Sequence, residues 1–583
     1  MMILKSEPEQ ARKIKSTNIG LACLVIAAAS LCVVGQVSSP SLSPAAQRSK
    51  VGKISGRVVN EKGQPLPNAR VMIRAVGSWD ASQTATTDQD GKFEVNGLDR
   101  VSYHVNAWFS TYSPMPRDLI DAQYGTYRVG DSPTLVLTKG GVITGTVTNG
   151  AGEPLVGIRV RARLTRETDF PIWYYGQSER TTDDRGIYRL YGLPAGTYVV
   201  WAGGPSLGAG IDVFDVDVPT YAPSSTRDTA SEITVRAGEE TTNVDIRYRG
   251  DAGHTVSGTV GGPATEQGMQ YAVDLTSATG VHWTSMRVVR MQDDRGFSFP
   301  GVDDGDYFVT ARSMLPNQEW AFSAPKRIQV KGVDITGIEL VTQPLGSVVA
   351  RVALEETKVP ECTDKQRPVL SETLVVARQK DSEVTRRTPR FIWLERAGVN
   401  ADAEGNVTLR NLTPNDYRFT AEFAGKYWYL HSISLASKTP KPVDAARNWT
   451  TIKPGARISG MTITLAEGAA SLRGQIVLAE GETLPDGLFA YLVPAEREKA
   501  EDVLRYFARP VTADGKIALN NVAPGRYWIL AQPALPGTVP PSTQLQLPDA
   551  TETRSKLRRA AEAAKHEIEF KPCQNVSDFR LPL

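Results

Sequence analysis

An excess of charge of one sign is missing from this sequence, and so is any long apolar run beyond its first 35 residues. The 66 lysine and arginine residues nearly balance the 64 aspartate and glutamate residues, so the chain lacks the electrostatic footprint that nucleic acid or anionic lipid requires. No later stretch approaches the roughly 20 apolar residues that span a bilayer. The sequence therefore predicts no nucleic-acid partner and no membrane span in this later part.

The start of the chain has the pattern of a signal peptide. Basic residues precede an apolar run from Ile19 to Val34. Val33 and Gly35 then supply the small side chains that a signal peptidase needs before a cut at Gln36. We therefore expect an exported protein, located in the periplasm, at the cell surface or outside the cell. Cleavage of the segment and its retention as an anchor both stay open.

Cysteine is scarce as well, with four residues in 583. Cys23 and Cys32 lie in the signal segment, which leaves Cys362 and Cys573. An oxidising compartment would permit one disulfide between them. Their distance in the sequence leaves the geometry undetermined, so a bridge and two free thiols are both open.

The composition is that of folded material rich in turns. A charged fraction of 22% and a hydrophobic fraction of 41% argue against wholesale disorder. The length suggests about four domains. The 50 glycines and 37 prolines predict many turns, and hence short strands rather than long helices.

One motif recurs five times along the chain: a polar turn ending in glycine, a short alternating strand, a second turn and a tyrosine strand. The turn glycines are Gly91, Gly186, Gly296, Gly405 and Gly515, and the tyrosines are Tyr103, Tyr198, Tyr307, Tyr417 and Tyr527. Glycine and tyrosine are 12, 12, 11, 12 and 12 residues apart, and successive glycines are 95 to 110 residues apart. A period of about 100 residues is the size of one β-sandwich domain rather than of a solenoid repeat.

Residue patterns within the copies favour strands. In the segment from Gly186 to Gly192, tyrosines and aliphatic residues alternate, which is typical of a half-buried strand. Acidic residues before glycine indicate turns, because glycine accepts positive φ and aspartate binds the local backbone. The final strand of one copy runs into the opening strand of the next within a few residues. We therefore expect limited swing between domains and a semi-rigid rod.

These signals give the expected domain division. It comprises a signal peptide (1–35), a linker (36–52) and β-sandwiches at 53–141, 142–250, 251–343, 344–467 and 468–583. The fourth copy carries an insertion between Glu355 and Arg396. In the fifth copy we expect a short helix from Glu498 to Phe507 and a second helix ending near Lys565, followed by a closing strand.

The second helix carries Arg554, Lys556, Arg558 and Arg559, which we interpret as a solvated face.

The run Gly-x-Val, Pro-Leu, Thr-Thr-Asp-x-x-Gly-x-Phe/Tyr and Gly-Thr-Tyr resembles the carboxypeptidase regulatory-like domain. Copies one and two match it most closely, over 54–107 and 143–202, although the first lacks the second turn's glycine. Copies three, four and five match its second half. The resemblance implies an all-β fold: a tandem array of about five Greek-key, transthyretin-like β-sandwich domains with minor helices near the C-terminus. It implies little about function, because such sandwiches host many roles.

In the metallocarboxypeptidases that give this domain its name, a separate zinc peptidase domain with a His-x-x-Glu pair performs the reaction. The five histidines of this chain form no such pair, and no nucleophile-elbow motif appears. We therefore predict no catalytic residues, no metal, no cofactor and no enzyme. The acidic turns Asp88-Gln-Asp-Gly91 and Asp183-Asp-Arg-Gly186 could supply calcium ligands, but we interpret them as turn caps.

Two aromatic clusters are the candidates for ligand contact: Trp173, Tyr174 and Tyr175, and also Tyr427, Trp428 and Tyr429. Flat aromatic faces stack on sugar rings or apolar peptide groups, although the second cluster is more typical of core and interdomain packing. We expect a bacterial-type, non-catalytic spacer and binding protein of the cell envelope, with a polysaccharide or an envelope protein as its partner. The alternatives are a dedicated carbohydrate-binding protein that uses the loop aromatics and an unrecognised hydrolase.

Overall fold

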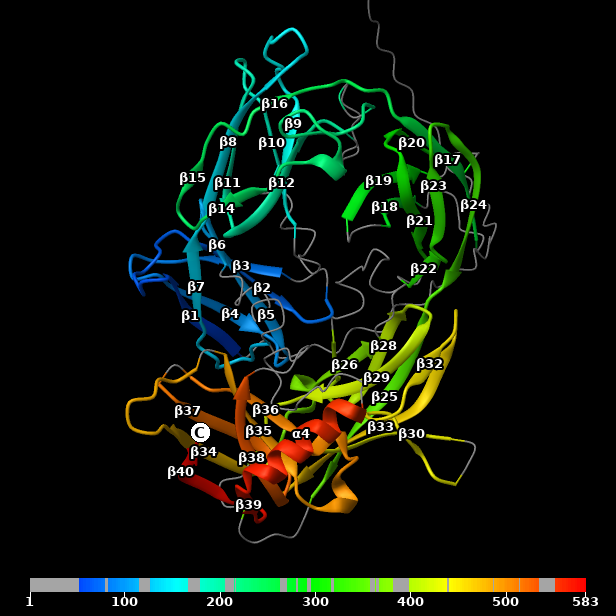
Figure 1. Ribbon diagram of the computed structural model, residues 1–583. Helices are drawn as coiled ribbons and strands as arrows, with labels where there is room; N and C mark the ends of the chain where they lie inside the picture. The colour runs from blue at the N-terminus through cyan, green and yellow to red at the C-terminus, as the bar shows by residue number, and fades with distance from the viewer. Residues whose placement is uncertain are drawn as a thin grey trace, which may run out of the picture. The chain divides into compact units, whose positions relative to one another are not determined.

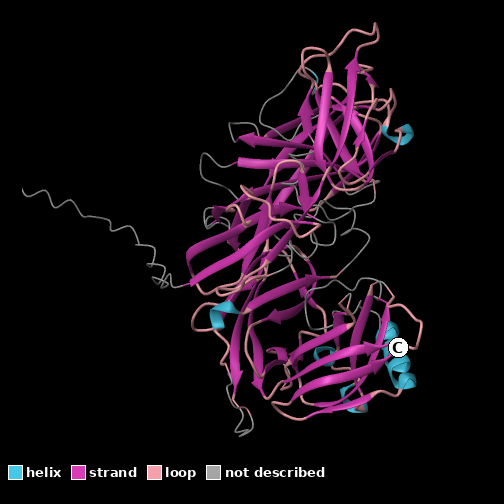
Figure 2. Cartoon of the chain, turned by 90° about the vertical axis from the view of Figure 1, so that its left-hand side faces the viewer, coloured by secondary structure: helices cyan, strands magenta, loops and turns pink. Residues whose placement is uncertain are grey.

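The structure is a computed structural model that describes residues 52–583 except 79–81, 115–125, 166–178, 205–213, 215, 263–269, 279–281, 291–294, 316–318, 357–361, 363–365, 381–397, 438–439, 486, 513 and 534–550. The described residues belong to one compact unit, Lys50–Leu583. They are dominated by strands, as Figures 1 and 2 show. The predicted signal peptide lies outside the described residues.

All five copies share one strand arrangement. The opening strand of each copy pairs antiparallel with the strand that follows the turn glycine and parallel with the last strand of the copy. The tyrosine strand pairs with the second strand of the copy. We number the resulting sandwiches 1 to 5 along the chain, and the predicted all-β tandem fold is confirmed.

Sandwiches 1 and 2 each contain two separate sheets. In sandwich 1 these are β4 (Lys92–Leu98), β1 (Gly52–Asn60), β7 (Thr134–Lys139) and β6 (Tyr112–Pro114), and β3 (Ser82–Thr86), β2 (Arg70–Ala75) and β5 (Tyr103–Trp108). In sandwich 2 they are β11 (Ile187–Leu193), β8 (Gly141–Thr148), β15 (Glu240–Thr241) and β16 (Ile246–Arg247), and β10 (Glu179–Thr181), β9 (Arg159–Leu164), β12 (Gly196–Ala202), β13 (Thr220–Tyr221) and β14 (Ile233–Val235). A short 3-10 turn, η3 (Arg227–Thr229), follows β13.

Sandwich 3 differs because a short strand joins its two sheets into one of eight strands. The strands are β19 (His282–Arg290), β18 (Gln270–Ser277), β21 (Gly305–Met314), β22 (Trp320–Ser323), β24 (Ile335–Pro344), β17 (His254–Gly261) and β20 (Gly296–Val302), with β23 (Lys326–Val330) on β21.

Sandwiches 4 and 5 return to two sheets each. Sandwich 4 contains β28 (Asn406–Leu412), β25 (Gly346–Glu355), β33 (Arg457–Glu467), β30 (Trp428–Leu435) and β31 (Val443–Asp444), and β27 (Val399–Asn400), β26 (Leu374–Gln379), β29 (Asn415–Glu422) and β32 (Thr450–Ile452). Sandwich 5 contains β37 (Lys516–Val522), β34 (Ala470–Val477) and β40 (Asn575–Pro582), and β36 (Phe507–Pro510), β35 (Leu488–Pro494), β38 (Gly525–Pro533) and β39 (Glu567–Phe570). The 3-10 turns are η4 (Leu370–Glu372), η5 (Arg497–Lys499) and η6 (Val503–Arg505).

Each sandwich has its own core of buried side chains. In sandwich 2, for example, Ile143 and Val147 of the opening strand meet Tyr188 and Tyr198 from the two motif strands. Alternate residues of each strand therefore enter the core, as a period of two requires. We propose that each core marks one domain with the boundaries predicted from the repeat.

The glycine in the opening strand recurs because the last strand passes close to it. A Cβ atom at Gly145 or Gly258 would overlap the carbonyl oxygen of Val244 or Ile338. Sandwich 4 has Ala350 at the corresponding position, paired with Met461 of its last strand. Close strand approach thus explains a glycine that the repeat pattern showed without a reason.

Two expectations about the irregular copies are wrong. The presumed insertion of copy four contains β26, which is the regular second strand and the counterpart of β18 and β35. The segment from Glu498 to Phe507 forms two 3-10 turns and the start of β36 rather than a helix. The Asp502 side chain accepts a hydrogen bond from the Leu504 amide and so begins a new turn instead of extending the first.

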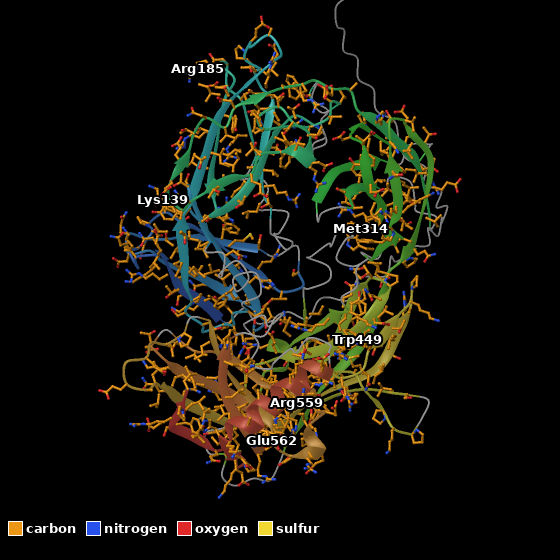
Figure 3. The ribbon with its side chains drawn as sticks, viewed as in Figure 1. Lys139, Arg185, Met314, Trp449, Arg559 and Glu562 are labelled. Atoms are coloured by element: carbon orange, nitrogen blue, oxygen red, sulfur yellow. A yellow bond between two sulfur atoms is a disulfide. The ribbon has the colours of Figure 1, made fainter. Side chains whose placement is uncertain are left out.

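The second predicted helix is present as α4 (Thr551–Ala564), and the closing strand as β39 and β40. Leu557 and Ala561 of α4 pack on the outer face of sandwich 5. Arg554 is buried and pairs with Glu501, so the expectation that its charge is solvated is wrong. The labels of Arg559 and Glu562 in Figure 3 mark α4, on which both residues are exposed. Within the described ranges, we find no helix with the length and hydropathy of a membrane-spanning segment.

Candidate functional site: the joints between sandwiches

The motif tyrosines make the same hydrogen bond in all five copies. Each hydroxyl donates to the main-chain oxygen four residues earlier, over 2.8 to 2.9 Å. The acceptors are Asp99, Pro194, Asp303, Thr413 and Ala523. Burial raises the pKa of Tyr307 and Tyr527 above the usual value. These hydroxyls therefore remain protonated and fix the second turn, as in the tyrosine corners of other sandwiches.

The acidic turn residues are used as caps. The Oδ1 atom of Asp183 accepts the amides of Arg185 and Ile187, at 3.0 and 2.8 Å. Asp88 and Asp402 bind their own turns in the same way. The hydrogen bond from the Ile187 amide is the main cause that lowers the pKa of Asp183. Among the described residues, no three histidine, cysteine, aspartate or glutamate side chains are grouped as metal ligands.

The two aromatic clusters have different outcomes. Trp173, Tyr174 and Tyr175 lie outside the described residues. Trp428 is buried in the core of sandwich 4. The preceding Tyr427 reaches sandwich 5: its main-chain oxygen accepts the amides of Gly468 and Ala469, and its hydroxyl lies 2.8 Å from Nδ2 of Asn575. The second cluster thus serves core and interdomain packing.

A left-handed residue just before the end of each post-turn strand forms part of the joints. The position is occupied by Gly97, Gly192, Gly301, Asn411 and Asn521, with φ of 70°, 73°, 68°, 60° and 57°. The two asparagines also contact the preceding sandwich. Oδ1 of Asn411 accepts the Trp320 amide at 2.8 Å, and Nδ2 of Asn521 donates to the main-chain oxygens of Gly425 and Trp428.

Glycine and asparagine are the residues that adopt this conformation most readily. The recurrence of these two types immediately before leucine or valine is the sequence signal that could have revealed the position.

Additional polar contacts strengthen individual joints. Between sandwiches 3 and 4, Glu319 lies 3.6 Å from Arg410 and 3.8 Å from Arg457. Between sandwiches 2 and 3, the Val218 amide donates to the main-chain oxygen of Asp251 at 2.9 Å. Neighbouring sandwiches are thus held by main-chain as well as side-chain groups.

Cys362 and Cys573 lie together in the structure. Their Cα atoms are 5.1 Å apart and their sulfur atoms are bonded. This Cα separation is within the range of protein disulfides. Cys362 belongs to the segment before β26 in sandwich 4, and Cys573 lies between β39 and β40 of sandwich 5. The pair therefore reinforces the same joint as Tyr427 and Asn521.

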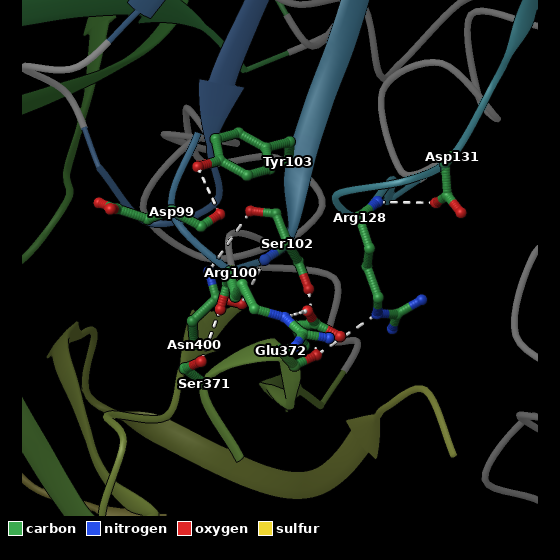
Figure 4. A network of polar contacts seen from close by, with 9 residues as sticks. All are labelled: Asp99, Arg100, Ser102, Tyr103, Arg128, Asp131, Ser371, Glu372 and Asn400. Atoms are coloured by element: carbon green, nitrogen blue, oxygen red, sulfur yellow. Dashed lines mark hydrogen bonds and ion pairs between the residues drawn. The ribbon is translucent and has the colours of Figure 1, made fainter. Parts of the chain in front are cut away.

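Sandwich 1 also contacts sandwich 4, which is not its neighbour in the chain. Figure 4 shows this network. Arg100 Nε lies 2.9 Å from Glu372 Oε1, and the Ser102 amide donates to Asn400 Oδ1 at 3.0 Å. The expectation of a rod in which each sandwich meets only its neighbours is therefore wrong. Short joints, which were the basis of that expectation, do not prevent the chain from turning back.

A buried ion pair lies on β18 and β21 of sandwich 3. Arg312 Nε is 3.4 Å from Asp274 Oδ2, and the aspartate is fully buried. Burial raises the pKa of Asp274 to about 6, although Arg312 opposes the shift. The pair stands out electrostatically, but such pairs serve structure as well as catalysis.

Comparison with known proteins identifies the first repeat. Residues 53–130 match the family model of the carboxypeptidase regulatory-like domain, which confirms the resemblance for this stretch. No match is found among the curated proteins.

Solved structures show only remote similarity. The Bacillus anthracis TIE protein is 14% identical with a TM-score of 0.14, over 50% of this chain and 51% of that one. The minor pilin GBS52 of Streptococcus agalactiae is 13% identical with a TM-score of 0.19, over 34% and 96%. A putative polysaccharide binding protein of Bacteroides thetaiotaomicron is 5% identical with a TM-score of 0.17, over 29% and 76%. The chain thus spans about half the length of the TIE protein, and scores this low carry no argument about function.

Proposed function

We propose that the protein is exported and non-catalytic, and that its sandwiches act as spacer and binding modules at the cell envelope. The observation that carries this proposal is the construction of the joints. At the joint between sandwiches 4 and 5, Tyr427, Asn521 and a cysteine pair bind the two domains across a connection of two residues, Gly468 and Ala469. Interfaces with so many fixed contacts restrict domain motion, which suits a spacer that presents loops at set positions.

Hydrogen exchange on the full chain tests the spacer role. We expect the amides of Gly468 and Ala469 to exchange as slowly as those of the flanking strands β33 and β34, because both donate to Tyr427. Exchange at the rate of an exposed loop would show a flexible joint and contradict the proposal. Fractionation of a bacterium that produces the complete chain tests export, and accumulation of the protein in the cytosol would contradict it.

The partner that we propose is a polysaccharide or an envelope protein, contacted by loop aromatics. Retention of the protein on insoluble envelope polysaccharides, compared with retention on envelope proteins, separates the two. Loss of polysaccharide retention in Trp173→Ala would favour the carbohydrate-binding alternative. Trp449→Ala is the matched control, because Trp449 packs under the Arg418 guanidinium at 4.2 Å (Figure 3). Turnover of peptides or glycosides by the purified chain would overturn the non-catalytic assignment.

A further inference from the structure

One short segment of sandwich 4 contacts two other sandwiches. It lies between β25 and β26 and has no counterpart in the other copies. At Cys362 it is bonded to Cys573 of sandwich 5. At η4, ten residues further along, Ser371 and Glu372 contact sandwich 1.

The contact with sandwich 1 is reciprocal and specific in its hydrogen bonds. Ser371 Oγ donates to the Arg100 main-chain oxygen at 2.6 Å, while Arg100 Nε lies 2.9 Å from the Glu372 carboxylate. Ser102 Oγ donates to the Glu372 main-chain oxygen at 3.3 Å. Both sides thus supply donors and acceptors, and Figure 4 shows them converging around Glu372.

Asn400 of β27 provides a second anchor beside η4. Its Oδ1 atom accepts the Ser102 amide at 3.0 Å, and its Nδ2 atom donates to the main-chain oxygen of Val76 at 3.2 Å. Main-chain groups of two separate segments of sandwich 1 are therefore satisfied by a single side chain. Such pairing depends on the backbone shape of sandwich 1 and not only on its charge.

Burial distinguishes this contact from an ordinary surface ion pair. The Glu372 side chain is 6% exposed and Ser102 is fully buried, although the Arg100 side chain remains 55% exposed. Exposed ion pairs contribute little, but a buried carboxylate that loses its partner pays the full cost of desolvation. Removing Glu372 or Asn400 should therefore weaken the contact more than removing an exposed charge.

We infer that this segment is a tie with two ends: Cys362 fastens sandwich 5, and Glu372 with Asn400 forms a docking site whose occupant is the Arg100–Ser102 loop of sandwich 1. Docking fixes sandwich 1 against sandwich 4, so binding loops on non-neighbouring sandwiches are presented together. The inference goes beyond the proposed function, because a spacer needs contacts only between neighbours.

Distance measurements between spin labels on the full, oxidised chain test the docking. Labels are placed on cysteines that replace Glu61 of sandwich 1 and Glu404 of sandwich 4, both exposed. We expect one narrow distance distribution in the otherwise unchanged chain. The variant Glu372→Gln with Asn400→Ala should broaden it and shift it to longer distances. Asp444→Asn, which removes an exposed carboxylate of sandwich 4 away from the contact, should leave it unchanged.

Circular dichroism and an unchanged distance between labels within sandwich 1 confirm that the variants are folded. A broad distribution in the unchanged chain would overturn the inference, and so would a narrow one in the folded double variant. A distance that depends on protein concentration would also overturn it, because docking would then occur between two copies. Envelope retention measured in parallel separates this outcome from failure of the proposed function.

Discussion

Asn521 of sandwich 5 donates a hydrogen bond from Nδ2 to the main-chain oxygen of Trp428 in sandwich 4, over 2.7 Å. The donor residue adopts a left-handed conformation at the end of a strand, and the acceptor belongs to a buried core tryptophan. A single side chain thus couples the strand geometry of one sandwich to the core of the next.

Replacing Asn521 separates its two roles. Asn521→Gly keeps the positive φ but removes two hydrogen bonds, so we expect a loss of about 1–3 kcal/mol. Asn521→Ala should lose roughly 1 kcal/mol more, because alanine is strained in this conformation. Urea unfolding of the full chain measures both. The neighbouring exposed Asn520→Ala is the control, and an equal loss in all three variants would contradict the assignment.

Tyr198→Phe should destabilise sandwich 2 without changing its shape. The substitution removes the bond from the buried hydroxyl to Pro194, 2.8 Å away, which is worth about 0.5–1.5 kcal/mol. Tyr191→Phe offers a matched control, since that ring lies under Arg180 at 4.4 Å and the substitution keeps the ring. Thermal unfolding should show a lower transition temperature for Tyr198→Phe than for Tyr191→Phe. Equal temperatures would remove the role assigned to the five motif hydroxyls.

The stability of sandwich 3 should fall as the pH rises from about 4 to about 6. Burial raises the pKa of Asp274 to about 6 in the folded chain, so the folded state binds the proton more tightly than the unfolded state. The stabilisation is complete below the ordinary aspartate pKa and is lost as the pH rises through the folded value, by up to about 3 kcal/mol. Asp274→Asn should abolish this slope in melting curves recorded between pH 4 and 7.

The exposed Glu339→Gln, from the same sandwich, should retain the slope. A wild-type chain whose melting temperature is level across this range would show that Arg312 keeps Asp274 ionised.

The oxidised, mature chain should contain no reactive thiol, folded or unfolded, because Cys362 and Cys573 are bonded. Thiol titration without reductant measures this directly, and two reactive thiols would refute the bridge. Replacing both cysteines by alanine should cost about 2–4 kcal/mol in unfolding free energy.

The repeat predicted the fold because its signals are local. A turn glycine and a tyrosine strand each follow from residues adjacent in the sequence, and both recur in all five sandwiches. The contact of Arg100 with Glu372 could not be predicted in this way, since it joins residues 272 apart. The same limit explains the error over Glu498 to Phe507, where pairing of β36 with β35 outweighs local helix preference.

The opening strands provide a matched pair of substitutions for the last prediction. Gly258→Ala places a methyl group against the carbonyl oxygen of Ile338, so we expect a loss of about 1–3 kcal/mol from overpacking. Sandwich 4 accommodates Ala350 at the same position, where the reverse change Ala350→Gly removes a buried methyl group. That change should cost roughly 1 kcal/mol, through lost packing and greater freedom of the unfolded chain. Urea unfolding of both variants checks the signs. Tolerance of Gly258→Ala would mean that close strand approach is not the reason that glycine recurs there.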